Sequence, residues 1–297
     1  MKRIFKQAVC AALIIPMLQA AALSSAESCT AWAAAGDRVS NGGILLAKNR
    51  DWEPERNELK LVTPEKGFRY MGLLALQPDG SRWVVAGINE KELVVISTTA
   101  SSIPRKERLT GARGLDEKVL ANCDSVDSVI RHRDMLSESH PVFLMLADKS
   151  GIACVEIAPE GRIAVKTTNS GTLCHTNHYI DSHLLWANRK IGSSSSSRLD
   201  RIEQLLAEHS SPLTLEDFVR FSEDRNDGPD ESIWRTGSRP GKTRTLASWI
   251  VSIPEKGVPS LYLKLANPGE TEKMYRLQID ETLWTKGWSE TGAAFHQ

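Results

Sequence analysis

Two short apolar runs near the start of the chain, separated by a glycine-containing turn, restrict the fold more than any other segment. The first run, residues 28–34, and the second, residues 44–47, both have the composition of β-strands, and the turn sequence Ser-Asn-Gly-Gly at 40–43 lies between them. Asn-Gly pairs favour the tight turns that join antiparallel strands. The pattern therefore predicts an N-terminal hairpin, which would carry Asp51 back toward Cys29.

The residues before this hairpin have the pattern of a secretory signal peptide. Lys2, Arg3 and Lys6 form a positive start, an apolar run extends from about residue 8 to residue 23, and small residues follow. We expect residues 1–28 to be removed and the product to be periplasmic or secreted. Because the run is short and no later stretch reaches about 18 apolar residues, no transmembrane helix is predicted.

The cleavage site decides the chemical state of Cys29. Small residues at Ser24 and Ala26 fit a cut that leaves Glu27 and Ser28 ahead of the cysteine. Ala26 and Ser28 fit a cut nearly as well, and this one makes Cys29 the first residue. A lipid-modified cysteine is the third alternative, but Glu27 fits badly into the apolar-small-small-Cys pattern of such sites.

Charge and cysteine content exclude some functions. The 37 basic and 37 acidic residues give a formal net charge of zero, and without a basic run nucleic-acid binding has little support. Cys10 would leave with the signal. The spacing of the remaining cysteines matches no zinc or disulfide framework. An export compartment permits disulfides, and whether one pair among Cys123, Cys154 and Cys174 is bridged is left open.

Strand and helix patterns together fill the rest of the chain. The expected strands are 82–87, 93–99, 142–147, 152–158, 162–167, 245–253, 260–266 and 273–278. The expected helices are 115–132, 198–209 and 215–223, with the five serines at 193–197 as a flexible loop whose last member, Ser197, caps the second helix, and with 222–242 as a long loop. This content indicates residues 29–297 as a single layered α+β or α/β domain.

A cysteine that begins a chain carries two reactive groups. Its α-amine titrates near pH ~8, so part of the population is the free base at neutral pH. That amine can accept the thiol proton, and no separate histidine is then needed. A carboxylate at Asp51 could hold the α-ammonium and orient the thiol. The hypothesis is therefore that Cys29 acts as both nucleophile and base.

The segment from residue 29 to residue 52 resembles the N-terminal-nucleophile (Ntn) hydrolases. It is most similar to the superfamily of choloylglycine hydrolases and acyl-CoA:6-aminopenicillanic-acid acyltransferases (peptidase C45-like, carcinine hydrolase). The shared features are Cys29-Thr30, a Gly-containing turn, and Asn49 two residues before Asp51. The resemblance continues through the sequence Gly-Ile-Asn-Glu-Lys-Glu-Leu at 87–93 and through a C-terminal strand pair, to about residue 277.

The resemblance implies roles for further residues. Asn177 would donate a side-chain N–H to the oxyanion of a tetrahedral intermediate, a contact typically worth ~3 kcal/mol. Arg198, after the serine run, would hold developing charge, and a backbone N–H near Thr98 or Thr99 would be a second oxyanion donor. Lys48 stands where the bile-salt branch has an arginine, which favours the acyltransferase-like branch; with Asn49 it is a further candidate.

The implied fold is a four-layer αββα sandwich of two antiparallel sheets flanked by helices. The implied activity is that of an exported acylase or amidase, which cleaves linear amide C–N bonds of a small molecule through a thioester on the thiol nucleophile. No metal and no organic cofactor are expected, and a homo-oligomer is left open. The alternatives are an N-acyltransferase on the same scaffold and a non-catalytic periplasmic ligand-binding protein.

Three histidines suggest two different kinds of site. His175, His178 and His183 could hold zinc, although no carboxylate motif accompanies them. His178 could also serve as the base of a papain-like Cys-His pair, although the local signature of that family around the cysteine is missing.

Overall fold

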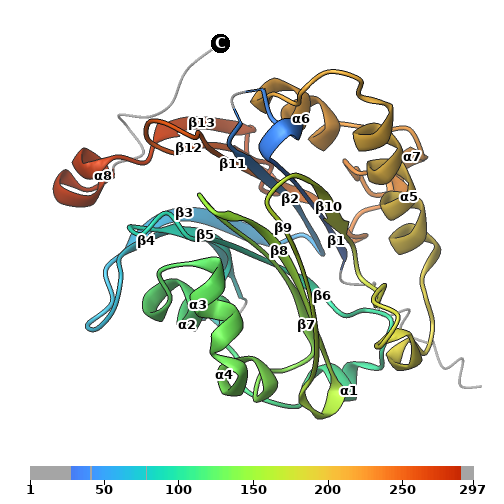
Figure 1. Cartoon of the computed structure of the whole chain (residues 1–297). Coiled ribbons are helices and arrows are strands. Elements are labelled where there is room, and N and C mark those ends of the chain that lie inside the picture. Colours follow the sequence, from blue (N-terminus) through green and yellow to red (C-terminus); the bar gives the residue numbers. More distant parts are fainter. Residues whose placement is uncertain (1–27, 41, 78, 289–297) are drawn as a thin grey trace, which may run out of the picture.

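Two antiparallel sheets pack face to face in the computed structural model, which describes residues 28–40, 42–77 and 79–288. One sheet has six strands in the order β10-β1-β2-β11-β12-β13, and the other has seven in the order β3-β4-β5-β6-β7-β8-β9. Helices α5 and α6 contact the first sheet, and α2, α3 and α4 contact the second (Figure 1). The four-layer αββα sandwich expected from the sequence is confirmed. The proposed signal peptide lies outside the described residues, apart from Ser28.

The strands and helices have the following bounds. The strands are β1 Ser28–Ala35, β2 Ile44–Trp52, β3 Arg56–Val62, β4 Tyr70–Leu76, β5 Arg82–Asn89, β6 Val94–Thr99, β7 Val142–Asp148, β8 Gly151–Ala158, β9 Arg162–Thr168, β10 Gly171–His175, β11 Arg244–Ile253, β12 Ser260–Leu265 and β13 Lys273–Gln278. The α-helices are α1 Arg105–Arg108, α2 Leu115–Asn122, α3 Val126–Arg131, α4 Arg133–Ser137, α5 Ser193–Glu208, α6 Leu215–Ser222, α7 Gly228–Glu231 and α8 Glu281–Lys286.

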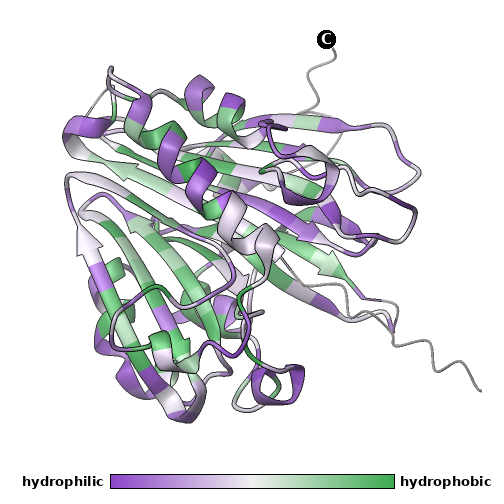
Figure 2. Ribbon diagram, turned by 90° about the vertical axis from the view of Figure 1, so that its right-hand side faces the viewer, coloured by the Kyte–Doolittle hydropathy of each residue, from purple (hydrophilic) through white to green (hydrophobic). Residues whose placement is uncertain are grey.

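Side chains alternate along β1 and β2, so these strands contribute to two hydrophobic clusters, one on each face of their sheet. Ala31 and Ala33 of β1 pack with Leu46 of β2 in the cluster between the two sheets. Trp32 and Ala34 point to the other face and pack beneath α5 and α6. Hydrophobic residues accordingly concentrate on the strands (Figure 2). Since successive strand residues face opposite sides, Cys29 shares the inter-sheet face with Ala31.

The predicted N-terminal hairpin is confirmed. Strands β1 and β2 pair antiparallel, with Ser28 opposite Asp51 and Cys29 opposite Arg50. The connection holds a single turn of 3-10 helix, Gly36–Arg38. The register therefore places the end of β2 beside the start of β1.

The serine run was wrongly predicted as a loop. Residues 193–197 form the first turns of α5, which begins at Ser193 and not near Arg198. Their hydroxyls find partners outside the helix: Ser193 Oγ donates to Glu231, and Ser194 Oγ donates to the carbonyl of Asp230. These contacts satisfy the hydroxyls that would otherwise compete with the helical backbone.

The single helix predicted over 115–132 was also wrong. It is divided into α2 and α3 by the extended residue Cys123, and Ser125 caps α3 by accepting the Ser128 N–H. Strands β3, β4 and β10 were not predicted at all.

Candidate active site

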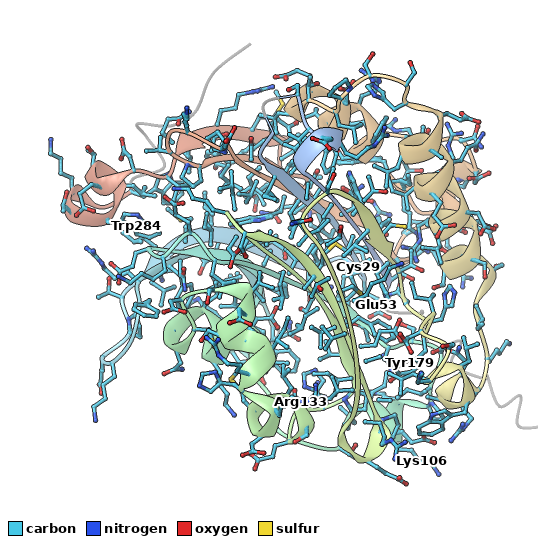
Figure 3. The ribbon with its side chains drawn as sticks, viewed as in Figure 1. Cys29, Glu53, Lys106, Arg133, Tyr179 and Trp284 are labelled. Atoms are coloured by element: carbon cyan, nitrogen blue, oxygen red, sulfur yellow. The ribbon has the colours of Figure 1, made fainter. Side chains whose placement is uncertain are left out.

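Cys29 is the second residue of β1 and lies in the interior of the molecule (Figure 3). Only 2% of it is exposed, and it lines a cavity of about 510 Å³ together with residues of β2, β5 and β6. Its backbone N–H donates to Asn177 Oδ1 at 3.0 Å, and its Sγ lies 3.9 Å from the carbonyl oxygen of Asp51. A cavity of this size accommodates a small organic molecule.

Arg198 connects α5 to the start of β1 from a fully buried position. One terminal nitrogen, Nη1, donates to the carbonyl of Cys29 at 2.6 Å and to Thr30 Oγ1 at 2.7 Å. The other, Nη2, donates to Asn177 Oδ1 at 2.8 Å, and Nε donates to Ser194 Oγ at 3.2 Å. The guanidinium therefore fixes both the backbone of Cys29 and the side chain of Asn177.

Asp51 is fully buried beside Arg198, with 4.0 Å between its Oδ2 and Arg198 Nη1. Its Oδ1 accepts the hydroxyl of Thr245 at 2.7 Å, while Oδ2 has no hydrogen-bond partner among the described residues. Burial raises the pKa of Asp51 against the attraction of Arg198, and burial lowers the pKa of Arg198 to about 10. Both pKa shifts show that the surrounding groups do not fully offset the cost of burying the Asp51 carboxylate and the Arg198 guanidinium in their charged forms.

The side-chain amide of Asn177 is held from three sides. Its Oδ1 accepts from Cys29 N and from Arg198, and its Nδ2 donates to the carbonyl of Thr99 at 2.9 Å. An amide nitrogen carries two hydrogens, so the second is available to a reacting oxygen. Thr99 lines the cavity, whereas Asn177 is not among its lining residues and reaches it through this bond to Thr99.

Lys48 and Asn49 point to opposite faces of β2. Lys48 lines the cavity with Cys29 and donates from Nζ to the carbonyl of Val85 at 2.6 Å. Burial lowers the pKa of Lys48, partly offset by the nearby thiol group. Asn49 instead donates to the carbonyls of Ser222 and Ile233 at 2.7 and 2.9 Å. The structure thus brings Lys48 to the cavity, whereas Asn49 ties the sheet to the helical layer.

Several cavity residues were not predicted from the sequence. They come from β2, β5, β6 and the segment around α1 and α2, and include Trp52, Trp83, Ser97, Arg105, Arg108, Arg113 and Asp116. Two sequence signals pointed toward them: the high number of tryptophans, eight against four tyrosines, and the density of arginines between residues 105 and 113.

The three histidines have separate surroundings. His175 Nε2 lies 3.0 Å from Glu156, and His178 Nδ1 lies 2.8 Å from Ser195 Oγ. His183 is exposed. Within residues 28–40, 42–77 and 79–288 no group of three His, Cys, Asp or Glu residues is placed to hold a metal ion, and no helix has the length and apolarity of a membrane span.

Comparison with known families gives one match along the sequence. The sequence profile described as acyl-coenzyme A:6-aminopenicillanic acid acyl-transferase matches residues 38–270. The matched range includes Lys48, Asp51, Asn177 and Arg198 and begins after Cys29. A search of curated proteins found no match.

Comparison with solved structures finds proteins that have a similar fold. Two variants of conjugated bile acid hydrolase from Clostridium perfringens give TM-scores of 0.52 and 0.51, each at 15% identity, over 84% of this chain and 92% of theirs. Penicillin V acylase from Agrobacterium tumefaciens gives 0.45 at 13% identity, over 85% of this chain and 86% of its own. The first two similarities show a shared fold at low sequence identity.

Proposed function

The chain belongs to the acyl-coenzyme A:6-aminopenicillanic acid acyltransferase family, and we propose that it hydrolyses linear amide C–N bonds with Cys29 as the nucleophile. Membership places it among enzymes that hydrolyse amides or transfer acyl groups. The observation that carries the finer proposal is the position of Cys29, whose side chain lines the cavity while its N–H and C=O are held by Asn177 and Arg198.

The proposed reaction uses the α-amine of a Cys29 that begins the mature chain. The amine takes the thiol proton, the thiolate adds to the amide carbonyl, and Asn177 Nδ2 with a backbone N–H near Thr99 stabilises the oxyanion. The α-ammonium then protonates the leaving amine, and the C–N bond breaks to give a thioester. Water adds to the thioester, releasing the acid and regenerating the thiol. With an amine in place of water the same steps would be acyl transfer, which stays the second candidate function.

Asp51 Oδ2 is the acceptor that we propose for the α-ammonium. It is buried, lacks a hydrogen-bond partner among the described residues, and belongs to the residue that pairs with Ser28, directly before Cys29. A second cation would compensate the carboxylate that Arg198 alone leaves under-compensated. This role requires that the chain be cut between Ser28 and Cys29.

The fold limits when that cut can occur. Ser28 is 2% exposed and paired in β1, so a peptidase cannot bind around the Ser28–Cys29 bond of the folded chain. We propose that cleavage precedes folding, during export, or that the cysteine thiol itself cleaves the bond. Intact mass of the exported protein tests this proposal. A fully active enzyme that keeps Glu27 and Ser28 would contradict it.

We expect iodoacetamide to modify Cys29 first and to abolish activity. Burial raises the pKa of Cys123 and of Cys154, and burial together with Glu203 raises the pKa of Cys174 to about 12. At pH 7–8 these three thiols are therefore mainly protonated and slow to react. Peptide mass mapping at one equivalent of label provides the measurement. Labelling of Cys174 ahead of Cys29, or full activity after Cys29 is labelled, would remove the thiol from the mechanism.

We also expect amides with a carboxylate to be preferred over neutral ones. Six cationic side chains line the cavity, and two of them, Arg50 and Arg82, are paired with Glu55 and Glu58. The other four, Lys48, Arg105, Arg108 and Arg113, still outnumber the two acidic lining residues, Asp116 and Glu117. Substituting Arg105→Gln, at the exposed rim, should raise KM for an anionic amide about fivefold, the effect of roughly 1 kcal/mol from a partly screened charge.

The control for this expectation is Arg133→Gln, an exposed arginine on α4 outside the cavity lining. Added salt should raise KM for the anionic amide and leave KM for its neutral methyl ester unchanged. Equal KM values for the acid and the ester in the wild type would show that the cavity does not select charge.

A further inference from the structure

Asp116 is a buried carboxylate in the cavity that the proposed reaction does not use. It is the second residue of α2, 7% exposed, and it lines the same cavity as Cys29. Its side chain bonds with Ser97, but its Oδ1 has no hydrogen-bond partner among the described residues. A buried carboxylate oxygen without a donor is costly, so the absence of a partner here requires an explanation.

The protein around Asp116 compensates its charge without supplying that donor. Lys48 attracts the carboxylate across the cavity, but the hydrogen bond that its ammonium makes goes to the carbonyl of Val85. The N-terminal position in α2 adds a favourable dipole. Even so, burial raises the pKa of Asp116 to about 6, with Lys48 opposing the shift. An ordinary acidic residue in the first turn of a helix would be solvated, whereas this one faces a cavity of about 510 Å³.

We propose that Asp116 is a substrate-recognition residue whose Oδ1 accepts a hydrogen bond from an amino or hydroxyl group that the substrate carries near its scissile amide. The inference rests on the proposed function, since it places the reacting amide in this cavity beside Cys29. Together with the cationic rim, it describes a substrate with a donor group at the reacting end and a carboxylate farther out. A purely apolar acyl group would leave Oδ1 buried and unpaired.

The test measures binding, which does not depend on the chemical step. In a Cys29→Ser background, calorimetry would compare Kd for amides matched in pairs, such as phenylacetyl against mandeloyl and phenylglycyl anilides, and alanine against serine amides of one acid. We expect at least one donor-bearing member to bind about tenfold more tightly than its partner, the effect of a hydrogen bond to a charged group. Asp116→Leu should reduce that ratio to about one, and Asp116→Asn, which keeps an acceptor, should retain part of it.

A purely structural Asp116 predicts a different result. Substitution would then weaken both members of each pair equally, or change only the melting temperature, and the ratio would stay at its original value. Absence of any preference for donor-bearing members in the Cys29→Ser protein with Asp116 intact would overturn the inference as well. Asp127→Asn, an exposed acidic residue on α3, provides the matched control. Failure of the proposed function would show separately, as absence of amide turnover by the protein with Cys29 intact.

Discussion

Replacing Cys29 by serine is expected to lower kcat/KM for amide hydrolysis by about 10³-fold or more, equivalent to about 4 kcal/mol of transition-state stabilisation. A serine hydroxyl is a far weaker acid than a thiol, so a neighbouring amine activates it much less effectively. The substitution changes one atom and keeps the backbone contacts to Asn177 and Arg198, so the free energy of unfolding should change little. Steady-state kinetics and denaturant unfolding measure the two quantities.

The matched control is Cys174→Ser. Cys174 is a thiol on β10, opposite Trp32 of β1, and lines a different cavity from Cys29. Its Sγ donates to Glu203, a contact that a serine hydroxyl can reproduce, so activity should stay within about twofold of the wild type. A Cys29→Ser protein that folds and retains wild-type kcat/KM would exclude the nucleophile assignment. A ligand-binding protein would instead show unchanged affinity and no turnover in either form.

The part of the site that the sequence predicts is the part built by local structure. The turn at 40–43 and the β-type runs beside it specify a hairpin, and its register brings Asp51 to the start of β1. Asn177 and Arg198 lie far away along the chain, so no local pattern could place them, and only the resemblance to the Ntn family connected them to Cys29. Their hydrogen bonds in the structure agree with that connection.

The features that were not predicted from the sequence depend on contacts between residues that lie far apart along the chain. The serine run forms a helix because residues of α7 accept its hydroxyls, which composition alone cannot show. Strand β3, at the edge of its sheet, contains Asn57, Glu58 and Lys60, residue types that are depleted in strands, so its strand propensity is weak. Asp116 joins the cavity because α2 packs on β5 and β6, an arrangement that helical periodicity does not specify.

Replacing Arg198 by methionine is expected to destabilise the fold by about 3–5 kcal/mol, the usual cost of removing one partner from a buried ion pair. Arg198 makes four hydrogen bonds without exposure to solvent. The variant would leave the carbonyl of Cys29 without this donor and the carboxylate of Asp51 buried without its nearest cation. Its activity should fall as well, because Asn177 would lose one of the contacts that orient it. Denaturant unfolding and kinetics of the same preparation measure both effects.

The matched control is Arg131→Met, which removes an exposed arginine paired with Asp127 on α3 and should cost no more than about 0.5 kcal/mol.

The double variant Arg198→Met with Asp51→Asn distinguishes the loss of stability caused by the unpaired charge from the loss caused by the missing hydrogen bonds. If the unpaired carboxylate dominates the loss, neutralising Asp51 should recover about 1–3 kcal/mol of it, because an uncompensated buried charge is then gone. No recovery would assign the loss to the hydrogen bonds of Cys29, Thr30 and Asn177. An Arg198→Met protein as stable and active as the control would mean that α5 does not hold the site together.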